Sequence, residues 1–225
     1  MLEPPATFQA DFDRIALLSQ DGWNHNTHYH SFLLNAIPRC RNALEIGCGT
    51  GAFSRLLARR ADHVLALDLS PQMIRLAQER SKQFPNIAFQ VADILTWGWP
   101  AEPFDCVVTI ATLHHLPLEV SLLKMAQALK VGGVLVVLDL FAGRGLPDLL
   151  TSAIALPSDL VMRLIQNGRM RESRAVREAW AAHGRHEHYQ TLAHIRQICA
   201  RILPGAQVRK HLFWRYSIIW KKTMA

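Results

Sequence analysis

Short apolar runs alternate with segments of helical periodicity through the middle of the chain. Five of these runs are apolar at nearly every position, and polar or glycine-containing residues follow each of them. Strands of this composition, separated by helices, are typical of a parallel sheet that is covered on both faces. The pattern therefore predicts an α/β fold with a doubly wound, mostly parallel sheet. The predicted strands are residues 43–46, 63–67, 87–91, 104–110 and 134–140.

The segments between these strands carry helix signals. Apolar residues at helical spacing follow the glycine turn that ends the first strand. Ser70-Pro71 supplies an N-cap and a first-turn proline for a helix that runs to about Lys82. A further helix is predicted over 118–130, followed by a turn at 131–133. Helices therefore occupy the crossovers that parallel strands require.

The alternation of strands and helices stops after Leu140. An arginine-rich helical region follows over roughly 145–188, and we interpret it as a helical cap inserted after the fifth strand. Beyond the cap, the pattern predicts a helix over 189–203 and two short strands, 207–213 and 216–220. These two strands are expected to form a closing hairpin.

The chain has 225 residues, half of them hydrophobic, and can bury a sizeable core. It contains no run of 18 apolar residues, so we expect no membrane span. Its first residues lack the basic and apolar regions of a secretory signal. The four cysteines form no CxxC pair and are interpreted as reduced thiols. We expect a soluble, cytoplasmic protein that is a monomer or a homodimer.

The basic residues are unevenly distributed. Residues 141–225 carry 14 Lys and Arg against 5 Asp and Glu, whereas residues 1–140 carry 11 against 13. The arginines of 163–177 could face nucleic acid, an anionic substrate or a membrane surface. The simpler interpretation is the solvated face of an arginine-rich helix. Because no recognised RNA-binding motif accompanies this region, we expect no specific nucleic-acid partner.

A glycine-rich turn, Gly47-Cys48-Gly49-Thr50-Gly51, separates the first strand from the first helix of the sheet. Such a turn lets an anionic ligand group approach backbone N–H groups. Asp68 ends the second strand 19 residues after Gly49, where a carboxylate can accept both hydroxyls of a ribose. This spacing suits a dinucleotide or S-adenosylmethionine. The dinucleotide fingerprint is matched only imperfectly by Gly47, Gly49 and Ala52.

Two further features favour S-adenosylmethionine over a dinucleotide. Asp93-Ile94 follows the third strand, where the carboxylate can accept from an adenine amino group and the next N–H can meet a ring nitrogen. Glu45 precedes the glycine turn and can influence a ligand's ammonium group. An NAD-dependent oxidoreductase has no particular need for Asp93-Ile94, so that alternative is disfavoured.

Five ordered motifs between about residues 40 and 140 together resemble one protein family. They are Leu44-Glu45-Ile46-Gly47-Cys48-Gly49-Thr50-Gly51, Ala66-Leu67-Asp68-Leu69-Ser70, Asp93-Ile94, Phe104-Asp105 leading to Leu113-His114-His115-Leu116, and Leu129-Lys130-Val131-Gly132-Gly133. In this order they are similar to the class I S-adenosylmethionine-dependent methyltransferases of the small-molecule type. The resemblance implies a Rossmann-like seven-stranded sheet with an antiparallel final strand, and S-adenosylmethionine as cofactor.

The resemblance also implies which residues bind that cofactor. They are Glu45 beside the ammonium group, Gly47, Gly49 and Gly51 against the methionine part, Asp68 on the ribose, Leu69 and Met73 flanking the adenine, Asp93 and Ile94 on its edge, and Ile110 near the methionine end. We expect a single methyltransferase domain, 1–225. Its expected segments are an N-terminal lid or gate (1–40), a cofactor-binding core (41–140), the helical cap (141–188), and a last helix with the closing hairpin (189–225).

The histidine-rich stretch 23–30 allows two interpretations. A metal site is one, because the spacing of His25, His28 and His30 recurs at positions 183, 186 and 188. Neither cluster contains cysteine, and methyl transfer needs no metal, so we expect no metal ion. The other is a cofactor lid and substrate gate at the start of a helix over 28–37. In the family's fold this segment crosses the cofactor pocket. Tyr29 or His30 would then donate to the methionine carboxylate, while His25 and His28 would face the substrate.

His114-His115 follows the fourth strand, next to the position of the transferred methyl group in this fold. Either imidazole could act as a general base, although packing or cofactor positioning is the simpler role. The catalytic candidates are His28, His25 and His115. The expected function is methyl transfer from S-adenosylmethionine to a small-molecule acceptor, with O-, N- and C-methylation unresolved. The alternatives are an RNA methyltransferase that uses residues 163–177, or a non-catalytic S-adenosylmethionine-binding subunit.

Overall fold

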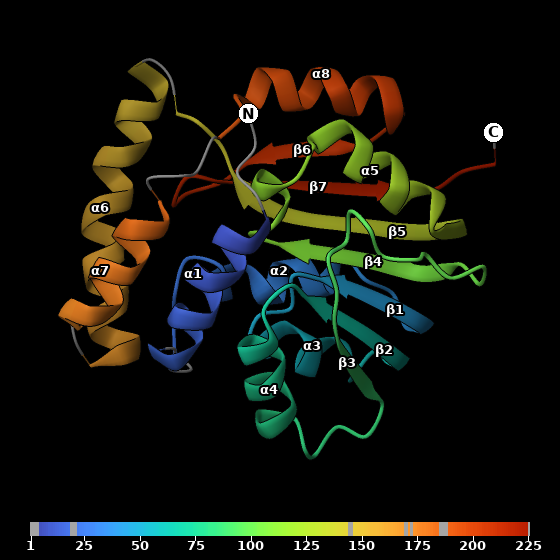
Figure 1. Ribbon diagram of the computed structural model, residues 1–225. Coiled ribbons are helices and arrows are strands. Elements are labelled where there is room, and N and C mark those ends of the chain that lie inside the picture. The colour runs from blue at the N-terminus through green and yellow to red at the C-terminus, as the bar shows by residue number, and fades with distance from the viewer. Residues whose placement is uncertain are drawn as a thin grey trace.

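The computed structural model describes residues 5–18, 22–143, 146–168, 171, 173–184 and 189–224. Within these ranges the chain forms a seven-stranded sheet in the order β3-β2-β1-β4-β5-β7-β6, with helices on both faces (Figure 1). Every neighbouring pair from β3 to β5 is parallel, and β7 runs antiparallel to both β5 and β6. The predicted doubly wound, mostly parallel fold is confirmed. The strands are β1 (Cys40–Ile46), β2 (Ala61–Asp68), β3 (Ile87–Val91), β4 (Phe104–Ile110), β5 (Leu129–Leu140), β6 (Gln207–Lys210) and β7 (Arg215–Lys221).

Helices cover the sheet because alternate side chains of each strand point to opposite faces. On one face, Leu44 and Leu135 pack in a buried cluster with α5 and α8. On the other, Ala43 and Val136 pack with α2 and α3. The helices are α1 (Pro5–Leu18), α2 (His30–Asn35), α3 (Ala52–Leu57), α4 (Pro71–Arg80), α5 (Leu118–Gln127), α6 (Leu146–Asn167), α7 (Arg174–His183) and α8 (Leu192–Ile202), with short 3-10 turns η1 (Thr27–Tyr29) and η2 (Leu113–His115).

Several predicted boundaries are wrong. The strand predicted over 207–213 ends at Lys210, and the helix predicted over 118–130 ends at Gln127. Residues 131–133, predicted as a turn before the fifth strand, lie inside β5, which begins at Leu129. The register between β4 and β5 shifts near this point, and Gly132 has a φ of +84°. A Cβ on Gly133 would lie 2.9 Å from the carbonyl oxygen of Lys130. The two glycines therefore allow an irregularity within a continuous strand.

The N-terminal segment contains α1, a helix that the sequence pattern did not predict. Phe8, Phe12 and Ile15 lie at helical spacing, and α1 packs with this face toward α4 and α7. Polar and aromatic side-chain contacts hold it in place. Asp13 Oδ1 accepts a hydrogen bond from Ser70 Oγ at 2.5 Å, and Asp11 Oδ2 lies 3.2 Å from His183 Nδ1. The helix α1 thus packs against α4, which connects β2 to β3, and against α7.

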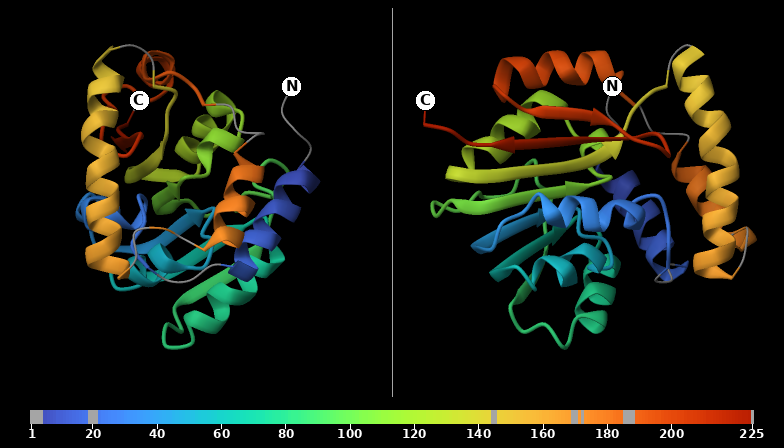
Figure 2. Two further views of the ribbon diagram at one scale, coloured as in Figure 1. Left: turned by 90° about the vertical axis from the view of Figure 1, so that its left-hand side faces the viewer. Right: turned by 180° about the vertical axis from the view of Figure 1, so that it is seen from behind.

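The region predicted as a cap contains α6 and α7, which lie beyond the carboxyl ends of the parallel strands (Figures 1 and 2). Of the two, α7 packs beside α1, whereas α6 stands apart from α1 at the same end of the molecule. The predicted helix over 28–37 is replaced by η1 and the shorter α2. Among the described helices, none combines the length and apolar character needed to cross a bilayer.

Candidate active site

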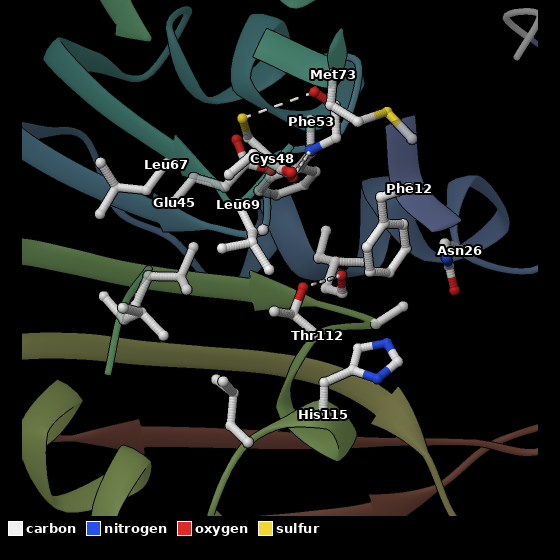
Figure 3. A pocket seen from close by; sticks show the side chains of 18 of the residues that line it. Phe12, Asn26, Glu45, Cys48, Phe53, Leu67, Leu69, Met73, Thr112 and His115 are labelled. Carbon is white, nitrogen blue, oxygen red and sulfur yellow. Dashed lines mark hydrogen bonds between the residues drawn. The ribbon is translucent and has the colours of Figure 1, made fainter. Parts of the chain in front are cut away.

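A cavity opens at the carboxyl ends of β1 and β4, where the strand order reverses. Its volume is about 490 Å³. The glycine loop after β1, the ends of β2 and β4, and the helix α1 contribute to its lining (Figure 3). Trp180 of α7 also lines it. This cavity is the candidate active site.

The loop between β1 and α3 presents backbone to the cavity. Gly47 and Gly49 line it with φ angles of +73° and +52°. A Cβ on Gly47 would lie 1.9 Å from Oγ1 of Thr112, whereas a Cβ on Gly49 would meet no atom within 4 Å. A glycine is therefore required at position 47, because the side chain of Thr112 leaves no room for a Cβ. The space beside Gly49 is open for a ligand.

Asp68 ends β2 and joins the glycine loop to the start of α4. Its Oδ2 accepts a hydrogen bond from the Gly49 N–H at 2.8 Å, and its Oδ1 accepts one from the Ser70 N–H at 2.9 Å. Ser70 caps α4, as predicted, by accepting from the Met73 N–H. Burial raises the pKa of Asp68, and the two N–H groups oppose that rise. The Asp68 carboxylate thus holds both the glycine loop and the start of α4 in place beside the cavity.

Glu45 lies in β1, with its side chain buried beneath the glycine loop. Ser54 in α3 donates a hydrogen bond to its Oε2 at 2.5 Å. Burial raises the pKa of Glu45 to about 8; the Ser54 hydroxyl opposes the rise, and the charge of Asp68 adds to it. In the unliganded protein this carboxyl is therefore largely protonated at neutral pH. A cationic ligand group beside it would favour ionisation.

The substitution Glu45→Gln is expected to remove a pH dependence of stability in the unliganded protein. A carboxyl whose pKa is raised to about 8 keeps a proton in the folded state that the unfolded chain releases. The free energy of unfolding of the wild type should fall between about pH 5 and about pH 8, by up to about 1.4 kcal/mol per pH unit relative to Glu45→Gln. Urea denaturation across this range measures the difference.

Glu79→Gln is the matched control for this prediction. Glu79 is exposed on α4 and pairs with Arg75 at 2.8 Å, so its replacement should leave the pH dependence of stability close to that of the wild type. Parallel curves for the wild type and Glu45→Gln would contradict the prediction.

Most of the residues predicted to bind the cofactor line this one cavity. His30 is among them, with its ring 5.1 Å from that of Phe53. Burial and the nearby charge of Arg55 lower the pKa of His30 to about 4, so its imidazole is neutral at pH 7. The predicted cofactor residues that line the cavity are His30, Glu45, Gly47, Gly49, Asp68, Leu69, Met73, Asp93, Ile94 and Ile110.

Tyr29 and Gly51, also predicted to contact the cofactor, are not among the residues that line the cavity. The hydroxyl of Tyr29 donates to the carbonyl of Leu212 at 3.1 Å, beside the closing hairpin. A Cβ on Gly51 would meet Phe89 and Ala77 at 3.1 and 3.2 Å. The structure gives these two positions packing contacts outside the cavity, so it does not support the predicted cofactor contacts.

His25 and His28, predicted to face the substrate, also lie outside the cavity lining. His25 Nε2 lies 2.8 Å from Asp159 Oδ1 in α6, and its ring stacks on Phe213 with centroids 4.6 Å apart. His28 is exposed, with its ring edge-on to Trp23. His25 therefore helps to hold α6, and the geometry does not support a substrate-side position for either histidine.

The second histidine cluster is only partly described. His183 is buried between α1 and α7, with its ring 4.7 Å from that of Phe12. Positions 186 and 188 lie outside the described residues. Within the described part of the chain, no group of three or more His, Cys, Asp or Glu side chains could hold a metal ion.

His114 and His115 have different surroundings, although they are adjacent in η2. The His114 side chain is directed at the buried Asp139, with Nδ1 2.5 Å from Oδ1, and its backbone N–H donates to Oδ2 at 2.7 Å. His115 lines the cavity, with its ring 5.0 Å from Phe8 and 5.5 Å from Phe12. Asp139 therefore anchors the turn, and His115 is the histidine of the pair that reaches the cavity.

Several residues that line the cavity were not predicted as site residues. Asn26 and Thr112 supply polar atoms, while Phe8 and Phe12 of α1 and Trp180 of α7 supply aromatic surface. Figure 3 shows Phe12, Thr112 and His115 close to one another. The spacing of four between Phe8 and Phe12 was a readable helix signal, but nothing in it indicated that α1 covers the cavity.

Comparison with known proteins identifies the family. Residues 43–133 match the family model of a methyltransferase domain. An uncharacterised methyltransferase of Mycobacterium tuberculosis is 30% identical over 203 residues, which cover 88% of this chain and 96% of the relative. The chain belongs to the class I S-adenosylmethionine-dependent methyltransferases. The methyltransferase is therefore an enzyme whose cofactor is S-adenosylmethionine.

Other relatives match the methyltransferase in part or in fold alone. A malonyl-[acyl-carrier protein] O-methyltransferase of a Paenibacillus species is 44% identical over 102 residues, covering 41% of this chain and 36% of its own length. The crystal structure of the N-methyltransferase NodS from Bradyrhizobium japonicum, in complex with S-adenosylhomocysteine, has a TM-score of 0.65 at 19% identity. It covers 96% of this chain and 98% of its own. At that identity the likeness establishes the fold.

The chemistry of the lining of the methyltransferase cavity fits its cofactor. The open space beside Gly49 leaves room for a ligand against the loop backbone. Three carboxyl groups, those of Glu45, Asp68 and Asp93, offer acceptors for an ammonium group, a ribose and an amino group. Apolar side chains such as Leu69 and Ile94 lie between them and suit a purine.

Proposed function

We propose that this methyltransferase transfers the methyl group of S-adenosylmethionine to a small-molecule acceptor. The observation that carries the proposal is the aromatic end of the cavity, where Phe8 and Phe12 of α1 lie near His115 and Trp180 of α7 adds to the lining. Aromatic side chains around a few polar groups are typical of small-ligand pockets. Two relatives, a demethylmenaquinone methyltransferase of Tropheryma whipplei and a ubiquinone biosynthesis O-methyltransferase of Xylella fastidiosa, have names that refer to quinones, which agrees with a small-molecule acceptor.

The proposed cofactor contacts follow the lining of the cavity. Glu45 would accept from the ammonium group, Asp68 from the ribose hydroxyls, and Asp93 from the adenine amino group. His30 and Asn26 are proposed to contact the carboxylate in place of Tyr29, since both line the cavity and each has an N–H that can donate. These contacts would leave the methyl group directed toward Thr112 and His115.

The chemistry then depends mainly on positioning. S-adenosylmethionine supplies an electrophilic methyl group on a sulfonium, so the protein must hold the acceptor in line with it. Such alignment can contribute about 7–11 kcal/mol to lowering the barrier. If the acceptor is a hydroxyl or an ammonium group, His115 is the side chain proposed to take its proton.

An assay with methyl-labelled S-adenosylmethionine tests the proposal. The enzyme is incubated with a cell extract separated into small-molecule, RNA and protein fractions, and the label is followed by mass spectrometry. We expect enzyme-dependent label in the small-molecule fraction. Label confined to RNA would favour the arginine-rich region 163–177 as the substrate-binding surface. Cofactor binding without transfer to any fraction would favour a non-catalytic subunit.

His115→Ala is expected to lower turnover about 100-fold or more while cofactor affinity changes little, because a positioned base contributes about 10²–10⁴-fold. The measurement is kcat with the acceptor found above, together with calorimetric titration of S-adenosylhomocysteine. His63→Ala is the control, because His63 is exposed in β2 and does not line the cavity. Unchanged turnover in His115→Ala would remove His115 from the mechanism.

A further inference from the structure

Among the α6 side chains that the structure describes, those of Asp159 and Asn167 make polar contacts with the segment 23–25. Asp159 Oδ1 lies 2.8 Å from His25 Nε2 and accepts from Arg163 Nε at 2.7 Å. The side-chain amide of Asn167 both accepts from the Trp23 N–H at 2.9 Å and donates to the Trp23 carbonyl at 2.8 Å. Ala155 of α6 is small and buried.

The solvent-facing side of α6 carries large aliphatic side chains. Five of those that the structure describes are between 44% and 68% exposed. Their spacing of three and four places them in one strip along the helix. We call this strip the α6 strip; it consists of Leu156, Leu160, Val161, Leu164 and Ile165.

This arrangement reverses the usual polarity of a surface helix, which buries its apolar side and exposes its polar side. Scattered exposed leucines need no explanation, but a contiguous apolar strip marks a surface that another body covers. The strip therefore needs an occupant whose chemistry fits its surroundings.

The surroundings of the strip are basic. Residues 156–178 contain five arginines against three acidic residues, and Arg174 Nε lies 2.6 Å from Glu178 Oε1. Arg171, Arg174 and Arg177 are exposed next to or on α7, which lies on the same end of the molecule as α6 but apart from it (left view of Figure 2). Leu17 of α1 and Trp180 of α7 add exposed apolar surface to that end. Two copies of so basic a surface would repel each other, whereas an anionic surface would be attracted.

We propose that the α6 strip docks on the surface of an anionic lipid bilayer. An apolar helix face on the same end of the molecule as exposed arginines and a tryptophan has the chemistry of an interfacial membrane surface, with aliphatic side chains in the acyl boundary and cations among the headgroups. Because Trp180 both lines the cavity and is half exposed on this end, docking brings the aromatic end of the cavity to the lipid surface. Docking of this kind does not depend on which molecule accepts the methyl group.

Vesicle flotation of the full chain tests this proposal. The probes are vesicles of phosphatidylcholine alone and of phosphatidylcholine with about one third phosphatidylglycerol. We expect the protein to float with the anionic vesicles, to bind phosphatidylcholine about 10-fold less, and to release in high salt. Absence of binding to the anionic vesicles would overturn the proposal.

Two double variants test whether vesicle binding depends on the α6 strip or on exposed apolar residues of any helix. Leu160→Gln/Leu164→Gln is expected to lower the partition coefficient by about 30-fold, because two aliphatic side chains leave the lipid boundary. Val120→Gln/Leu123→Gln, two exposed positions on α5, should bind like the wild type. Both variants should keep the thermal stabilisation that S-adenosylhomocysteine gives, which confirms an intact fold.

Equal losses in the two variants, or no loss in Leu160→Gln/Leu164→Gln, would overturn the proposal. Sedimentation analysis without vesicles gives the remaining outcome. A wild-type dimer that Leu160→Gln/Leu164→Gln converts to a monomer would assign the strip to a second copy of the chain and overturn lipid docking.

Discussion

Asp68→Asn is expected to weaken the binding of S-adenosylhomocysteine by about 100-fold, or about 2.7 kcal/mol. In the unliganded protein, the two carboxylate oxygens accept from the N–H groups of Gly49 and Ser70. An amide has one accepting oxygen, so one of these N–H groups would face an NH₂ donor. The proposed ribose contact loses its charge at the same time. Isothermal titration calorimetry measures the affinity.

The control for this variant is Asp62→Asn. Asp62 lies in the same strand but is exposed at its opposite end, so its replacement should leave the affinity unchanged. Thermal unfolding without ligand shows whether Asp68→Asn is still folded at the titration temperature. An affinity within about threefold of the wild type, in a folded Asp68→Asn protein, would remove Asp68 from the cofactor site.

Gly47→Ala is expected to lower the free energy of unfolding by about 3–5 kcal/mol. The backbone at Gly47 has a φ of +73°, and a Cβ there would lie 1.9 Å from Oγ1 and 2.8 Å from Cβ of Thr112. The strain of the left-handed conformation and the displacement of the loop after β4 therefore add together. Urea denaturation of the unliganded protein measures the change.

Gly49→Ala and a double variant distinguish these two costs. Gly49 also has a positive φ, but a Cβ there has open space, so Gly49→Ala should lose only about 1–2 kcal/mol of stability while filling part of the cavity. Gly47→Ala/Thr112→Ala should recover part of the stability, because it removes the atom at 1.9 Å. Equal stabilities of Gly47→Ala and Gly49→Ala would show that the contact with Thr112 is unimportant.

The sheet and its cofactor side were predictable because their signals are local. An apolar strand, a glycine loop and a carboxylate at the next strand end fall into fixed positions once the strands are parallel, and Ser70 capped α4 as its sequence context indicated. The boundary of β5 was not predictable in this way. Gly132-Gly133 is a turn signal, and only the pairing of β5 with β4 and β7 makes it an irregularity inside a strand.

The histidine-rich stretch 23–30 shows why the residues that cover the cavity from the N-terminal segment could not be predicted. Asn26 and His30 are four residues apart and both line the cavity, whereas Tyr29 and His25, also four apart, pack against Leu212 and Phe213. The sequence contains both pairs, and a helical start could turn either one inward. The choice depends on how η1 packs against the last hairpin, which is formed almost 200 residues later.

The division of the cavity between two parts of the chain has an evolutionary consequence. The carboxylates proposed to bind the cofactor belong to the strands and loops of residues 40–110, while the aromatic end comes from α1 and α7. Those two helices touch each other, and α1 also packs on α4, where Asp13 accepts a hydrogen bond from Ser70. Exchange of the N-terminal helix and the cap between relatives could thus redirect acceptor preference as a unit, while the methyl donor half is inherited unchanged.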